Sequence, residues 1–98
     1  MKVLETRVVE ECLDGIVIRE VLFDGRIGAN FIKKLEILGT LEYFPHFPKP
    51  FFRVQQSGKY IIKGVEGNET CRIFYVNYSE EIQQLIYRTF QTVSQEGT

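Results

Sequence analysis

The stretch KYIIKGVEGNETCRIFYVNY, residues 59–78, decides the fold. Gly67 and Asn68 lie between two apolar runs, and such a dipeptide is typical of a two-residue β-hairpin turn. The stretch therefore predicts two antiparallel strands, each with one apolar and one polar face. The register that follows has three cross-strand pairs: Ile62 with Ile73, Tyr60 with Tyr75, and Lys63 with Arg72.

The run FFRVQ, residues 51–55, adds a third strand to this meander. We predict a three-residue loop over residues 56–58, with Gly58 in the left-handed conformation. A two-residue Ser57-Gly58 loop is the alternative, but it would set Phe52 opposite Lys63 and mix charge into an apolar face. The predicted pairs are Val54 with Tyr60 and Phe52 with Ile62. The predicted core wall is Phe52, Val54, Tyr60, Ile62, Ile73 and Tyr75.

The other face of this meander carries Arg53, Lys63 and Arg72, with Ile61 and Phe74 beside them. The predicted register sets Lys63 and Arg72 opposite each other, and like charges in this arrangement lower the stability of a sheet. We therefore predict that Arg53, Lys63 and Arg72 form an anion-binding site. Its ligand would be an anionic small molecule, an acidic partner or single-stranded nucleic acid. The alternative is a solvated face whose long side chains extend away from one another.

Two extended runs, residues 2–13 and 16–23, precede the meander. Asp14-Gly15 between them is a strong hairpin signal. With these two residues as the loop, Glu10 lies opposite Arg19, a favourable cross-strand charge pair.

Two segments have helical periodicity. The first lies within residues 25–39, where Gly39 is placed to end the helix. The second covers residues 79–93, with Ser79 as its N-cap and a frayed tail at 94–98. The apolar positions are Phe31, Ile32, Leu35 and Leu38 in the first, and Ile82, Leu85, Ile86, Phe90 and Val93 in the second.

These elements follow the order β-β-α-(β)-β-β-β-α, where the bracketed strand is the proline- and aromatic-rich segment that begins at residue 41, predicted as an extended loop or an edge strand that leads into FFRVQ. Short loops favour antiparallel pairing, because parallel strands need long crossovers. We therefore predict one α+β domain over residues 1–98, with a mostly antiparallel sheet and two helices packed on one face.

The segment LEYFPHFPKPFF, residues 41–52, holds all three prolines, the only histidine and five aromatic residues. Proline lacks an N–H, so the segment cannot be a helix or a central strand. Because side chains alternate along an extended chain, these aromatics cannot all face inward. We predict an interface for a homo-oligomer at Tyr43, Phe44, His46 and Phe47. The alternative is a lid over the open end of the core.

A second candidate anion site is the turn before the first helix, at Gly25 and Gly28. Helix N-termini bind anions through free N–H groups, although this segment matches neither the P-loop nor the dinucleotide fingerprint. Ordinary turn chemistry is the alternative.

Cys12 and Cys71 are predicted to be free, buried thiols, with a disulfide as the alternative. No metal site is expected, because Cys12, Cys71 and His46 are the only cysteines and histidine, and zinc would need carboxylates or a second subunit. No motif supplies His46 with a catalytic partner, so we predict no catalytic residue and no cofactor.

The net charge of −1 makes binding of duplex nucleic acid unexpected. No apolar run is long enough for a membrane span, and the N-terminal stretch does not have the pattern of a signal peptide, so a cytoplasmic location is expected. The sequence predicts a non-enzymatic, self-associating binding module. Two alternatives stay open: a binder of anions or single-stranded nucleic acid on the basic sheet face, and an enzyme that builds its site from His46 and carboxylates across a dimer.

Overall fold

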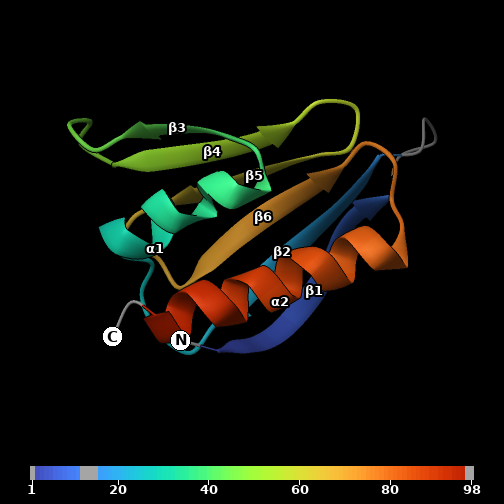
Figure 1. Ribbon diagram of the computed structural model, residues 1–98, viewed down its shortest axis with the longest axis horizontal. Coiled ribbons are helices and arrows are strands. Elements are labelled where there is room, and N and C mark those ends of the chain that lie inside the picture. Colours follow the sequence, from blue (N-terminus) through green and yellow to red (C-terminus); the bar gives the residue numbers. More distant parts are fainter. Residues whose placement is uncertain (1, 12–15, 97–98) are drawn as a thin grey trace.

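The computed structural model describes residues 2–11 and 16–96, which form one antiparallel sheet with helices on a single face (Figure 1). The strand order across the sheet is β1-β2-β6-β5-β4-β3. The strands are β1 (Val3–Glu11), β2 (Val17–Phe23), β3 (Thr40–Phe44), β4 (Phe51–Gln56), β5 (Tyr60–Val65) and β6 (Thr70–Tyr75). The helices are α1 (Ala29–Lys34), which continues as the 3-10 helix η1 (Leu35–Leu38), and α2 (Glu80–Glu96). This confirms the predicted α+β class and element order.

The β5–β6 hairpin has the predicted register at all three pairs, including Lys63 with Arg72. The predicted β4–β5 register is wrong by two residues: Val54 pairs with Ile62, and Phe52 with Gly64. The loop is residues 57–59, and Gly58 does take a left-handed conformation there. Gly64 explains the shift, since a Cβ at that position would lie 2.7 Å from the Phe52 ring. A shift of two residues keeps each side chain on its predicted face.

The pairing of β1 with β2 differs from the prediction. Val8, not Glu10, lies opposite Arg19, while Glu10 pairs with Ile18. The pair Glu10–Ile18 is already displaced by one residue from the prediction, and a register irregularity in β1 between Val8 and Glu10 adds a second residue, because an extra residue in one strand displaces every later pair. The predicted Asp14-Gly15 turn lies outside the described residues.

Local sequence explains where the helices begin and end. The Ser79 hydroxyl accepts a hydrogen bond from the Ile82 N–H at 3.2 Å, which is the predicted N-cap of α2. Gly39 ends η1 with φ of 156°, and a Cβ there would lie 2.5 Å from the Gln55 carbonyl oxygen. Only glycine therefore allows the chain to pass so close to β4. Helix α2 continues past the predicted end to Glu96.

The core lies between the sheet and the helices. Phe23 of β2, Phe31 of α1 and Phe90 of α2 pack together, with ring centroids 5.4–5.8 Å apart. The Tyr60 hydroxyl donates to the Leu38 carbonyl oxygen at 2.5 Å and so ties β5 to the end of η1. Within the described chain, no helix has the length and apolar character to cross a membrane. All six residues of the predicted core wall are buried.

One predicted core position is wrong. Leu85 belongs to the expected apolar stripe of α2, but 48% of its surface is exposed, and Thr89 is buried instead. The Thr89 hydroxyl donates to the Leu85 carbonyl oxygen at 2.8 Å, which satisfies its polar group inside the helix layer. The opposite face of the sheet, which no helix covers, carries the candidate site.

Candidate anion-binding face of the sheet

One residue from each strand lies in a single row across the uncovered face. Every neighbouring pair in this row is directly opposed in the sheet register. From β1 to β3 the row consists of Arg7, Glu20, Arg72, Lys63, Arg53 and Glu42. We call it the charged row. Its three central residues are the cations Arg72, Lys63 and Arg53, which lie side by side between Glu20 and Glu42. The centre of the charged row is therefore positively charged.

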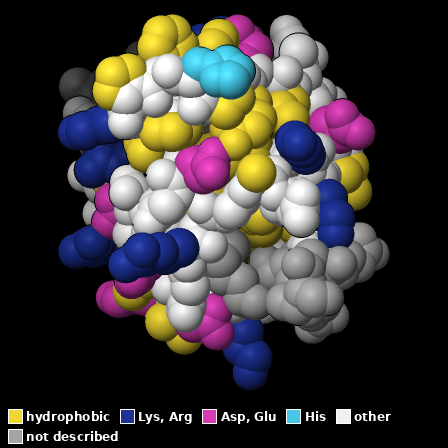
Figure 2. Space-filling view, turned by 90° about the vertical axis from the view of Figure 1, so that its left-hand side faces the viewer, with side chains coloured by type: hydrophobic (Ala, Val, Ile, Leu, Met, Phe, Trp, Pro, Cys, Tyr) yellow, Lys and Arg dark blue, Asp and Glu magenta, His cyan; other side chains and the backbone are white. Residues whose placement is uncertain are grey.

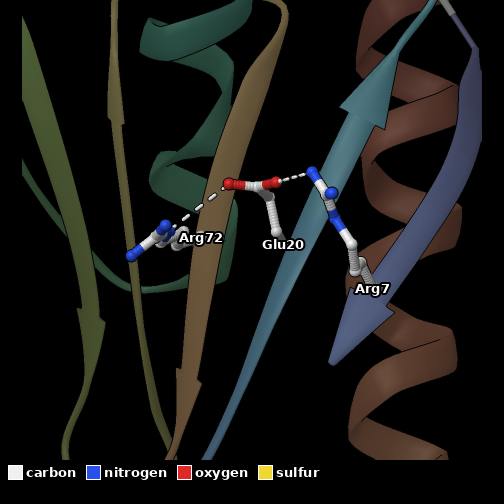
Figure 3. Close-up of polar contacts among 3 residues, drawn as sticks. All are labelled: Arg7, Glu20 and Arg72. Carbon is white, nitrogen blue, oxygen red and sulfur yellow. Dashed lines mark hydrogen bonds and ion pairs between the residues drawn. The ribbon is translucent and has the colours of Figure 1, made fainter. Parts of the chain in front are cut away.

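Glu20 joins two arginines from the strands on either side of it (Figure 3). Its carboxylate accepts from Arg7 Nη2 at 2.5 Å and from Arg72 Nε at 3.4 Å. The side chain of Glu20 is 16% exposed, whereas that of Arg7 is 70% exposed. The hydrogen bond from Arg7, supported by Arg72, holds the pKa of Glu20 below its ordinary value although partial burial opposes this.

At the other end of the row, Arg53 is neutralised in the same way. Its Nε donates to Glu42 Oε1 at 3.0 Å, and its Nη2 contacts the same oxygen. Lys63, between the two paired arginines, has no carboxylate partner among the residues that the structure describes. Its ammonium lies 5.0 Å from the centroid of the Phe74 ring, a cation–π contact that leaves N–H donors free.

A groove of about 630 Å³ follows the charged row. Its lining includes Lys63 and the two paired arginines, Arg53 and Arg72. Aromatic side chains from both flanks also line it: Phe74 on one side, Phe44 and Phe51 on the other. This combination of an apolar lining with a few convergent polar groups is typical of small-molecule sites, which have volumes of roughly 300–1,000 Å³.

The structure thus brings Arg53, Lys63 and Arg72 into one row. Sequence reasoning did not identify Glu20 and Glu42, the two carboxylates that neutralise the outer arginines. Glu20 carries a signal in the sequence, because Arg19 and Glu20 are adjacent in an extended run and must therefore point to opposite faces of the sheet. Glu42 does not, because its position opposite Arg53 depends on the β3–β4 pairing.

The proline-rich β3–β4 connection carries an aromatic cluster next to the groove. Phe44, Phe47 and Phe51 have ring centroids 4.7–5.6 Å apart, and Phe47 is 52% exposed. In Figure 2, which shows this end of the molecule, the histidine (cyan, His46) lies among hydrophobic side chains. Tyr43, the remaining predicted interface residue, packs on the core instead, and its hydroxyl donates to Glu66.

His46 lines a small hollow of about 300 Å³ together with Tyr43, Phe44, Pro45 and Phe47. None of these described lining residues is a carboxylate. Neither Gly25 nor Gly28 lines the groove. Ile27, between these glycines, donates its N–H to the Asn68 carbonyl oxygen at 2.8 Å and is therefore not free to bind an anion.

Cys71 is a free thiol, 3% exposed, on the inner side of β6. Burial, with a smaller contribution from the Glu20 charge, raises the pKa of its thiol. Cys12 lies outside the described residues. Across the part of the chain that the structure describes, no group of three or more His, Cys, Asp and Glu side chains is placed to hold a metal ion.

Comparison of the chain with protein-family models, with curated proteins and with solved structures finds no match.

Proposed function

We propose that the protein is a non-enzymatic binding module that holds an anionic, partly apolar small molecule in the groove over its charged row. The proposal rests on one observation: Lys63 lies between two arginines that already have carboxylate partners, and has none itself among the described residues. A ligand carboxylate, sulfonate or phosphate supplies the missing counter-charge. Charge-assisted hydrogen bonds of this kind are about twice as strong as neutral ones.

The aromatic side chains on both flanks of the groove favour a ligand that carries an apolar group beside its anionic one. Phe74 on one side and Phe44 and Phe51 on the other offer apolar surface in the groove that Lys63 also lines. An anion attached to a ring or a short alkyl group buries apolar area on these flanks, which contributes roughly 25 cal/mol per Å². A small inorganic anion lacks this contribution and should bind more weakly.

Single-stranded nucleic acid is the less favoured ligand for this face. Such binders follow the phosphate backbone with several free cations, whereas here Arg53 and Arg72 are held by Glu42 and Glu20. The chain also carries a net charge of −1, which opposes a polyanion at long range.

The test is a titration of the isotope-labelled protein with anilinonaphthalene sulfonate, an aromatic anion, followed by backbone NMR shifts. The expected shifts lie on residues of the groove lining, such as Lys63, Arg72 and Phe74. The uncharged analogue phenylnaphthylamine should bind far more weakly. Shifts confined to the helix face, or equal binding of the uncharged analogue, would refute the proposal. Tighter binding of an oligothymidylate than of the sulfonate would assign the face to nucleic acid instead.

Self-association is a second candidate function, and the aromatic cluster at the β3–β4 connection favours it. Phe47 is half exposed although its ring stacks on that of Phe51 at 5.5 Å. Exposed aromatic patches on a small domain are characteristic of protein interfaces. Phe47 does not line the groove, so the two functions can be tested separately.

A further inference from the structure

The helix layer carries a second groove, on the side of the molecule away from the charged row. This helix-layer groove has a volume of about 620 Å³ and lies between the α1–η1 segment and α2. Both segments lie in front of the sheet in Figure 1. The groove shares no lining residue with the groove over the charged row, so its role is independent of the proposed function.

The α2 wall of this groove is one stripe of the helix. Its lining residues are Leu85, Arg88, Thr89, Thr92 and Val93, which recur at the three- and four-residue spacing of a single helical face. At 1.5 Å per residue the stripe is about 12 Å long, or slightly more than two turns. The Thr89 hydroxyl donates its hydrogen bond to the Leu85 carbonyl oxygen within α2, so it does not need a water molecule as acceptor.

Two aliphatic side chains stand exposed on opposite sides of the groove. Ile37 of η1 is 69% exposed, and Leu85 of α2 is 48% exposed. Both leave apolar surface in water that a complementary partner would cover. Their facing arrangement matches helix-in-groove recognition, in which the anchors of one amphipathic helix insert between two supporting elements.

The charges around the groove are mostly of one sign. Lys33 and Lys34 end α1, and Arg88 lies on α2, whereas Glu36 is the one carboxylate among the described lining residues. The two lysines suit the negative end of the α1 dipole, and their ammonium groups remain available to a partner. This excess of cations selects a partner with acidic side chains beside its apolar stripe.

We propose that the helix-layer groove docks an acidic amphipathic helix of a partner protein. The occupant would place two or three aliphatic residues between Ile37 and Leu85, with carboxylates facing Lys33, Lys34 and Arg88. The groove lies between two helical segments, which favours a helix over a lipid surface, because a bilayer surface does not enter such a groove. A segment of about twelve residues, or three turns, is sufficient to cover the stripe.

The experiment uses the full chain, isotope-labelled, and two side-chain-stapled helical peptides of about twelve residues, or three turns. Both peptides carry leucines on one face; the flanking residues are glutamates in the first and lysines in the second. The acidic peptide should shift backbone NMR signals of α2 and of residues 33–37, and leave those of Lys63 and Arg72 unchanged. The basic peptide should bind at least about tenfold more weakly, since like charges would face each other across the interface.

Three variants sharpen the test. Ile37→Ser and Leu85→Ser change exposed side chains, so the fold should persist, yet each should weaken the acidic peptide about tenfold as central anchors do. Arg88→Glu should weaken the acidic peptide and strengthen the basic one, a reversal that loss of folding cannot produce. The proposal fails if neither peptide shifts these signals or if both peptides bind equally. It also fails if anionic phospholipid vesicles shift these signals and the acidic peptide does not. A shift of the same signals with protein concentration alone would contradict it too, because the occupant would then be a second copy of the chain.

Discussion

Arg53 lies directly opposite Lys63 on the neighbouring strand, so two cations meet at the centre of the uncovered sheet face. Arg72 flanks Lys63 on its other side. Directly opposed like charges destabilise a sheet, although water and salt screen exposed charges strongly. Lys63→Gln should therefore leave the free energy of unfolding unchanged or raise it by up to about 0.5 kcal/mol.

Urea denaturation measures this change, and Lys59→Gln is the matched control, since Lys59 is exposed in the β4–β5 loop away from the charged row. A loss of more than about 1 kcal/mol in Lys63→Gln alone would mean that Lys63 forms a stabilising ion pair, and would contradict the absence of a carboxylate partner for Lys63 among the described residues.

Glu20→Gln should have the opposite effect on stability. The substitution removes the carboxylate that Arg7 and Arg72 share, and exposed pairs contribute up to about 1 kcal/mol each, so we expect a total loss of about 1 kcal/mol. The pKa of Glu20 is lowered in the folded protein, so its contribution is present above its ordinary pKa of 4.5 and disappears as the pH falls through the lower, folded-state pKa. The difference in unfolding free energy between wild type and variant should thus be full at neutral pH and vanish in strong acid.

Denaturation across this pH range tests the prediction, with the exposed Glu36→Gln as control. The same Glu20→Gln variant should bind an aromatic sulfonate more tightly, because Arg72 loses its internal partner. Unchanged stability at neutral pH would contradict the shared ion pair, and weaker sulfonate binding would contradict competition between Glu20 and the ligand.

The class of fold and the side chains on each face of the central strands could be predicted from the sequence. Alternation along residues 51–75 separates apolar from charged side chains, and a register error of two residues left that separation intact, as Phe52 and Arg53 show. The error itself came from Gly64, whose missing side chain makes room for the Phe52 ring in a way that pairing rules do not anticipate.

The pairing of β2 with β6 is a different case. It joins residues far apart in the chain, such as Glu20 and Arg72, and no local pattern specifies it. The candidate site depended on this pairing and on that of Glu42 with Arg53. Sequence reasoning therefore identified the three central cations but not the two carboxylates, which pair with Arg53 and Arg72 and leave Lys63 without a carboxylate partner among the described residues.

Cys71 should behave as an inert thiol. Burial raises the pKa of its sulfhydryl group, and the thiolate is the form that reacts. In a Cys12→Ser variant, where Cys71 is the single cysteine, a thiol-specific reagent should label the native protein slowly and the urea-unfolded protein rapidly. Native labelling as fast as that of a free thiol would show that β6 exposes Cys71, against its burial in the structure.

Phe47→Ser should weaken self-association and leave the groove intact. Phe47 stacks with Phe44 and Phe51 at the exposed end of the β3–β4 connection, and truncating an aromatic anchor commonly costs about 2 kcal/mol of binding. Sedimentation velocity over a concentration series gives the association constant. Tyr43→Phe is the control, because the Tyr43 ring packs on the core. The aromatic cluster is not an interface if the wild-type protein remains monomeric at high concentration. The same conclusion follows if wild type and Phe47→Ser associate equally.

The most direct test of the central claim is the affinity of wild type, Lys63→Gln and Lys59→Gln for anilinonaphthalene sulfonate, measured by calorimetry at low and high salt. If the Lys63 ammonium binds the anionic group of the ligand, Lys63→Gln should bind the sulfonate about tenfold more weakly than wild type, because one charge-assisted hydrogen bond is lost. Lys59→Gln should bind it as tightly as wild type. The difference should shrink as salt rises, because ions screen the exposed ammonium. Equal affinity of all three proteins at low salt would contradict the claim and leave the charged row as a solvated surface.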